Sequence, residues 1–226
     1  MTSSTRSTQT GSTGEAAPRK LRCDASANRV RLLDAARTVF AERGLDAGVE
    51  EIAQVAGVGI GTLYRRFPTK DALITELVQV LLRHVLELAH EAEQVPGGRG
   101  LEQFVYGMGE AQTAHRGCLA RLWTDDSSTK TVRAECRASI AVLVADAKAH
   151  DVIRSDATAT DVDLLLWSVR GIIEATGDVS STAWRRLAAI ALAGLSPSTE
   201  PLREAPVAEA LVTRAREHTR HSPGSG

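Results

Sequence analysis

Several features that would place this chain in a specialised class are scarce or missing. Only 4% of its 226 residues are aromatic, and three cysteines, Cys23, Cys118 and Cys136, are too widely spaced for a disulfide framework or a zinc site. The longest apolar runs, 140–145 and 187–195, are too short or too interrupted to span a bilayer. Residues 1–18 lack the apolar segment of a secretory signal. We therefore expect a cytoplasmic protein with reduced thiols.

The residue patterns of catalysis and metal binding are missing as well. We find no nucleophile–base pair, no two carboxylates at a spacing suited to acid–base chemistry, and no glycine-rich phosphate loop after a strand. His84, His90 and His115 do not have the spacing of metal ligands. The sequence therefore predicts no enzymatic activity, no cofactor and no metal ion, with an all-α small-molecule enzyme as a remote alternative.

Charge is unevenly distributed, although the chain as a whole has a formal net charge of only −1. Residues 19–70 contain ten basic and six acidic side chains, a net charge of +4, and the remaining positions carry −5. Of the 27 basic residues 23 are arginines, whose planar guanidinium suits contacts with phosphate. The sign of this asymmetry favours a nucleic-acid contact in the first third of the chain.

Hydrophobic periodicity, interrupted by Gly and Pro, predicts an all-α fold with an N-terminal helix-turn-helix domain and a C-terminal helical domain. We expect four regions: a disordered tail over 1–22, a DNA-binding domain over 23–72, a ligand-binding and dimerisation domain over 73–196, and a flexible tail over 197–226. The last of these has an optional helix near 207–218. The expected helices are 26–43, 49–56, 60–67, 70–94, 100–115, 117–124, 128–151, 159–176 and 181–195.

The order of helices and turns between residues 29 and 73 is that of a helix-turn-helix. Gly44 is expected to end the first helix, and Gly57 to form the turn between the two short helices, where a positive φ costs glycine little. Ala53 is small enough to let the short helices approach, and Leu63 is expected to point into the core. The apolar face of the first helix comprises Val30, Leu33, Ala36 and Phe40, with Leu32 and Val39 beside it.

The other side chains of the second short helix suit a DNA surface. Hydroxyls donate to phosphate oxygens, arginine reaches phosphate or guanine, and an apolar side chain touches a thymine methyl group. Core packing of Tyr64 and a solvated Arg65–Arg66 pair are the alternatives, whereas Phe67 is expected to be core. The candidate DNA-contacting residues are Ile60, Gly61, Thr62, Tyr64, Arg65 and Arg66, with Lys70 at the start of the next helix.

The segment IAQVAGVGIGTLYRRFPTKDAL closely resembles the DNA-binding motif of the TetR family of bacterial transcriptional regulators. The resemblance covers 29–73, and beyond residue 90 only the helical layout is similar. It implies a homodimeric regulator, commonly a repressor that a small molecule releases from its operator. It also implies that Thr62, Tyr64 and Lys70 hold phosphates while Ile60, Gly61 and Arg66 face bases.

Two positions depart from the family pattern. Gly48 stands where a Ser or Thr commonly caps the helix, so one hydroxyl that could bind phosphate is missing. Ile60 occupies a position that is often polar, which favours apolar contact or recognition of DNA shape there.

The C-terminal half must then dimerise and bind an effector. The helices over 159–195 offer the apolar surface for a four-helix dimer interface, although some members are core. These apolar residues are Leu164, Leu165, Trp167, Ile172, Ile173, Trp184, Leu187, Ile190, Ala191 and Leu195. Candidate ligand contacts are Phe104, Met108, His115, Trp123, Trp167 and Arg170, with core packing, or an Arg170–Glu174 pair at i,i+4 spacing, as alternatives.

The sequence therefore predicts a homodimeric repressor on an inverted-repeat operator, with an unidentified small-molecule effector and no membrane contact. A transcriptional activator with the same DNA contacts is the alternative. A helical module that binds another protein is disfavoured, because the exposed side chains near Tyr64 are polar.

Overall fold

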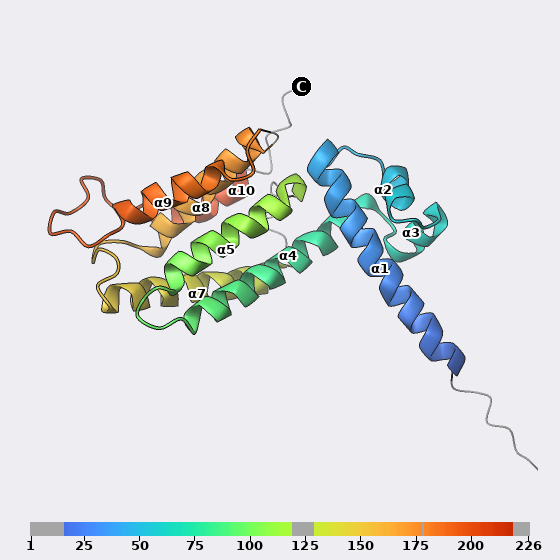
Figure 1. The fold of residues 1–226 in the computed structure, drawn as a ribbon, viewed down its shortest axis with the longest axis horizontal. Helices are drawn as coiled ribbons and strands as arrows, with labels where there is room; N and C mark the ends of the chain where they lie inside the picture. The colour runs from blue at the N-terminus through green and yellow to red at the C-terminus, as the bar shows by residue number, and fades with distance from the viewer. Residues whose placement is uncertain (1–15, 119–128, 178, 219–226) are drawn as a thin grey trace, which may run out of the picture.

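The computed structural model describes residues 16–118, 129–177 and 179–218, and every regular element in these ranges is helical (Figure 1). The expected all-α fold is confirmed. The elements are α1 (Ala16–Arg43), α2 (Val49–Val55), α3 (Ile60–Arg66), α4 (Lys70–Glu93), α5 (Gly100–Ala114), the 3₁₀ helix η1 (Arg116–Cys118), α7 (Lys130–Ala149), α8 (Ala159–Thr176), α9 (Ala183–Gly194) and α10 (Glu209–His218).

Figure 1 shows α1, α2 and α3 gathered at one end of the molecule and the remaining helices bundled at the other. The long helix α4 begins beside the first group and runs into the second. Among the described residues, no helix combines the length and the apolar character that crossing a membrane requires.

Local signals set most helix ends where the sequence predicts them. Gly44 and Gly57 have φ values of 72° and 65°, in the left-handed region that glycine adopts without strain. Thr69 caps α4, because its Oγ1 accepts a hydrogen bond from the backbone N–H of Ala72 at 3.1 Å. The helix expected over 117–124 is observed only as η1, and residues 119–128 lie outside the described ranges.

The first helix is longer than expected, because it begins at Ala16 rather than near Ser26. The expected disordered tail is therefore wrong for residues 16–22, and residues 1–15 lie outside the described ranges. Pro18 falls in the first turn, where a missing N–H breaks no intrahelical bond, so nothing in this stretch stops the helix. Val30, expected on the apolar face, is 52% exposed, and the buried face is formed by Leu32, Leu33, Ala36, Val39 and Phe40.

Trp184 fills the space between α9 and α5. It is 1% exposed, and a Cβ atom on Gly109 would lie 2.2 Å from its ring, so this close approach requires glycine at position 109. The indole Nε1 donates a hydrogen bond to the carbonyl of Ser181 at 3.1 Å, which satisfies the only polar atom of the side chain. Leu165, Ile173 and Leu195 are buried as well. These three residues and Trp184, all considered for the dimer surface, are core instead.

The C-terminal segment is packed where the sequence predicts a flexible tail. The Arg154 guanidinium forms an ion pair with Asp156 and donates a hydrogen bond to the carbonyl of Glu200 at 2.7 Å. The Asp156 carboxylate also accepts from the backbone N–H of Leu202 at 3.0 Å. Val212 in α10 is 2% exposed. The expectation of a flexible tail is therefore wrong for this anchored part, while the optional helix near 207–218 is confirmed as α10.

Candidate nucleic-acid interface and ligand cavity

The helix-turn-helix is held together by apolar side chains from three helices. Ile52 and Leu63 are fully buried, and Ala53 is 3% exposed, as close approach of α2 and α3 requires. The backbone N–H of Val58 donates to the carbonyl of Ala53 at 3.0 Å, which closes the turn at the end of α2. Burial of these residues, together with Phe40 of α1, fixes the rotation of α3 and hence the side chains that it exposes.

The outer face of α3 carries the side chains that the sequence predicts there. Tyr64 is 45% exposed and Ile60 is 40% exposed, so the core alternative for Tyr64 is wrong, whereas Phe67 is buried as expected. Arg65 and Arg66 are exposed as well. A Cβ atom on Gly61 would have no neighbour within 4 Å, so α3 is open to close approach by another molecule at this position.

Two further candidates border the same surface. The Nη2 of Arg65 donates to the Oγ1 of Thr62 at 3.3 Å, so these two side chains act as one polar unit. Lys70 lies in the first turn of α4, with its Nζ 6.0 Å from the centroid of the Phe40 ring. Its positive charge therefore belongs to the first turn of α4, where the backbone N–H groups also favour an anion. All seven candidate DNA contacts thus lie on α3 or directly after it.

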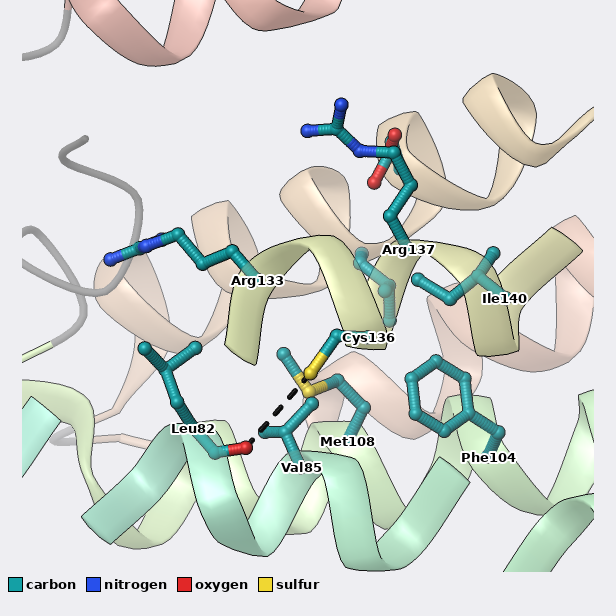
Figure 2. Close-up of a pocket in the computed structure, with 10 residues that line it drawn as sticks. Leu82, Val85, Phe104, Met108, Arg133, Cys136, Arg137 and Ile140 are labelled. Carbon is teal, nitrogen blue, oxygen red and sulfur yellow. Dashed lines mark hydrogen bonds between the residues drawn. The ribbon is translucent and has the colours of Figure 1, made fainter. Parts of the chain in front are cut away.

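A small cavity of about 50 Å³ lies between α4, α5, α7 and α8 in the second half of the molecule (Figure 2). Phe104 and Met108 line it, as the sequence predicts. Its wall comprises the apolar residues Leu82, Val85, Phe104, Met108, Ile140 and Leu166 and the polar residues Arg133, Cys136, Arg137 and Asp163.

Of the other predicted ligand contacts, the described residues His115, Trp167 and Arg170 do not line this cavity. Arg170 forms the alternative pair with Glu174, with 2.8 Å between its Nε and a carboxylate oxygen. Trp167 is half-buried on α8, and Trp123 lies outside the described residues. The Nδ1 of His115 is 2.9 Å from the carbonyl oxygen of Ala111. Burial lowers the pKa of His115 below its usual value, and the nearby positive charge of Arg37 lowers it further.

Cys136 is a buried thiol in the cavity wall. Burial, with the negative charge of Glu135, raises its pKa to about 11. Its Sγ lies 3.9 Å from the carbonyl oxygen of Leu82, the contact drawn as a dashed line in Figure 2. A protonated, enclosed thiol is a poor nucleophile, so Cys136 contributes packing and a weak hydrogen bond rather than reactivity.

Known proteins agree with this arrangement. The family described as bacterial regulatory proteins, tetR family, matches residues 32–77, from α1 into α4. The crystal structure of the TetR transcriptional regulator SCO0520 from Streptomyces coelicolor is 31% identical, with a TM-score of 0.57 over 76% of this chain and 99% of that chain. The chain belongs to the TetR family.

Two further TetR-type relatives support this assignment. A TetR transcription regulatory protein from Mycobacterium vanbaalenii is 28% identical, with a TM-score of 0.58 over 78% of this chain and 99% of that one. The HTH-type transcriptional repressor KstR2 from Rhodococcus jostii (strain RHA1) is 45% identical over 58 residues. That match covers 25% of this chain and only 28% of the repressor's length. These relatives are regulators rather than enzymes, so this TetR-family chain is a transcriptional regulator.

Two contacts in this TetR-family regulator were not predicted. The Nε of Arg116 donates to the carbonyl of Ala41 at 3.0 Å, and a Cβ atom on Gly117 would lie 2.0 Å from the carbonyl oxygen of Phe40. From the sequence, residues 116 and 117 indicated only a break between two helices, not a contact with α1. Arg133 and Arg137 are the second omission, although 133, 136, 137 and 140 have the i, i+3, i+4, i+7 spacing of one helical face.

Proposed function

We propose that this TetR-family regulator is a homodimeric, cytoplasmic repressor that a small-molecule effector releases from an inverted-repeat operator. The observation that carries the proposal is the exposed polar face of α3, which is held in a fixed rotation by the buried Leu63 and Phe67. The repressor role is supported by the likeness of the DNA-binding segment to KstR2, which is named as a repressor. An activator with the same contacts is the alternative.

In this proposal, α3 lies in the major groove of the operator. Thr62, Tyr64 and Lys70 hold phosphates, and Arg65 supports Thr62 through their hydrogen bond. Ile60 and Arg66 reach base edges, where an apolar side chain meets a thymine methyl group and a guanidinium meets guanine. The absent side chain of Gly61 lets the helix axis come close to the bases.

The dimer forms through the exposed face of α8 and α9. Ile190 is 56% exposed, and other apolar residues of these two helices are half-buried: Leu164, Trp167, Ile172, Leu187 and Ala191. A second copy related by two-fold symmetry would cover this surface with an identical one. Two recognition helices would then address half-sites about 34 Å apart, or multiples of that distance, along the DNA.

The effector site lies at the cavity between α4, α5, α7 and α8. Its present volume of about 50 Å³ is far below the roughly 300–1,000 Å³ of a typical ligand pocket, so binding must push these helices apart. Leu82 and Val85 of α4 line the cavity, so this movement reaches the helix that begins beside α3. A related fold, LfrR from Mycobacterium smegmatis, has been solved in complex with proflavine; it is 18% identical, with a TM-score of 0.56.

A selection experiment on genomic DNA tests the DNA-binding part. Purified protein should enrich fragments that share an inverted repeat, and the double variant Tyr64→Ala/Arg66→Ala should enrich none. Arg99→Ala, which changes an exposed arginine near the far end of α4, is the matched control and should behave as the wild type. Affinity should fall about 10³- to 10⁵-fold between 50 and 200 mM salt if six to ten phosphates are contacted. A folded dimer without bound effector that enriches no sequence would refute the proposal.

The repressor role needs a separate measurement. In transcription reactions on an enriched promoter, the wild type should lower transcript yield, and Tyr64→Ala/Arg66→Ala should leave it unchanged. A rise in transcript yield with the wild type would identify an activator instead.

A further inference from the structure

The cavity between α4, α5, α7 and α8 has an apolar floor and a cationic rim. Figure 2 shows Val85, Met108 and Phe104 together on one side, while the guanidinium groups of Arg133 and Arg137 extend away from them. This division suits a ligand with two unlike ends, because each end then meets atoms of its own kind.

Arg137 is incompletely satisfied. Its Nη1 donates to an Oε1 of Glu209 in α10 at 2.9 Å, but its Nε is buried and has no hydrogen-bond partner among the described residues. Nearly all buried donors in folded proteins are paired, so an unpaired Nε indicates a position where another acceptor belongs. A guanidinium has five N–H donors, so it can bind a second carboxylate while Glu209 remains.

Gln112 is the second unsatisfied group. It is fully buried, and neither its amide nitrogen nor its amide oxygen has a hydrogen-bond partner among the described residues. It follows Met108 by one helical turn on α5, so it shares the face that carries Met108 and Phe104. Gln112 does not itself line the cavity, so the unpaired Nε of Arg137 is the group that points to a ligand with a hydrogen-bond acceptor rather than a pure hydrocarbon.

The charge of the wall limits the ligand further. Asp163, which is 5% exposed, also lines the cavity, so the wall is not uniformly cationic. Arg137 offers one unpaired donor, its Nε, so a head group with a single negative charge is the one that it can anchor. The Arg137–Glu209 pair is itself weakly held, because Glu209 is 66% exposed and its charge is screened by water.

We propose that the cavity binds a monoanionic amphiphile, a carboxylate on an apolar body, with Arg137 as the anchor of the carboxylate. The apolar body replaces the loose packing among Val85, Phe104 and Met108, and the carboxylate accepts from the Nε of Arg137. Glu209 keeps its bond to the Nη1 of Arg137, and its negative charge repels a second carboxylate at the Nε, so α10 opposes binding. This assignment rests on the proposed function only in calling the ligand an effector.

Calorimetry on the full chain tests it with octanoate and, as the matched neutral probe, octan-1-ol. Wild-type protein should bind octanoate at least 10-fold more tightly than octan-1-ol. Arg137→Gln should weaken octanoate binding roughly 10- to 100-fold and change octan-1-ol binding less than 2-fold, because only the charge-assisted hydrogen bond is lost. Arg99→Gln, at an exposed arginine away from the cavity, should change neither.

Glu209→Gln supplies a readout in the opposite direction, which loss of structure would not produce. It removes the neighbouring negative charge, so octanoate should bind about 2- to 5-fold more tightly. The proposal is overturned if neither probe binds, if octan-1-ol binds as well as octanoate, or if Arg137→Gln weakens both probes equally.

These binding results are independent of DNA. Octanoate binding that leaves retention of the enriched DNA unchanged upholds the ligand class and contradicts the effector role. A wild type that retains DNA but shows no preference for octanoate contradicts the ligand class alone.

Discussion

The backbone carbonyl of Ala41 accepts a hydrogen bond from the Nε of Arg116, and this contact ties the last turn of α1 to η1. Ala41 and Arg116 are 75 residues apart in the sequence. Their hydrogen bond therefore joins the two halves of the molecule at a second place besides α4. Under the proposed function, a ligand that displaces α5 would therefore act on α1 through η1 as well as on the start of α4.

Gly117→Ala should disturb this junction without touching DNA or the cavity. A Cβ atom there would lie 2.0 Å from the carbonyl oxygen of Phe40, so η1 and α1 must separate. We expect a 5- to 150-fold change in affinity for the enriched DNA, the usual range of coupling between sites, measured by fluorescence anisotropy. Gly107→Ala is the control, because its Cβ would meet only the mobile end of Leu88 at 3.3 Å. Unchanged affinity in both variants would show that the junction does not position α3.

His115, which precedes η1, should make stability depend on pH. Its pKa is lowered by burial, so as pH falls below 6.5 the unfolded state takes up a proton more readily than the folded state. Stability contributed by the neutral ring is therefore present above pH 6.5 and is lost on acidification. The urea midpoint of the wild type should fall more between pH 7 and pH 5 than that of His115→Gln. If the urea midpoints of the two proteins fell equally with pH, a group other than His115 would be responsible for the pH dependence.

Gln112→Leu should stabilise the ligand-free protein. Neither polar atom of the buried amide has a partner within the described part of the chain, and replacing it with an apolar group of similar volume removes that desolvation cost of about 1–3 kcal/mol. Urea denaturation should show the gain, with Gln79→Leu on the half-buried surface of α4 as a control that should change stability by less than about 0.5 kcal/mol. A clear loss of stability would mean that ordered water satisfies Gln112.

Asp156→Asn should loosen the C-terminal segment. Its hydrogen bond from Arg154, and then that from the backbone of Leu202, lower the pKa of Asp156 from 3.8 to about 2. The stabilisation is complete above pH 4 and is lost as pH falls toward 2. Limited proteolysis at pH 7 should cut the variant faster between residues 197 and 208 than the wild type, and the difference should shrink below pH 4. Equal cleavage rates at pH 7 would contradict this anchoring role.

Local signals made the helices predictable. The expected helix over 159–176 matches α8 residue for residue, because Thr158 and Asp161 form a capping box at its start. The outer face of α3 was equally predictable. Burial of Leu63 in this seven-residue helix, and of Phe67 directly after it, leaves few orientations for the other side chains of the helix.

Features that depend on distant partners were not predictable in this way. Arg154 and Asp156 lie in a loop, and nothing local shows that they anchor residues 200 and 202. An arginine on a helix is by default a solvated residue, so Arg137 on the cavity rim had no separate signal. Phe104 and Met108 were predictable because apolar side chains on one helical face must be covered by something, whether core or ligand.

The boundary expected at residues 72 and 73 falls inside α4, a single helix whose first turn lies beside α3 and whose middle lines the cavity. The two halves of this regulator are consequently not interchangeable modules. A chimera could join this N-terminal half to another family member at the loop before or the loop after α4. The first junction would replace this chain's own α4, and either junction would replace the η1 that docks on α1. A productive exchange would need an arginine and a glycine at positions 116 and 117 of the incoming half, because both meet the backbone of the last turn of α1 rather than its side chains.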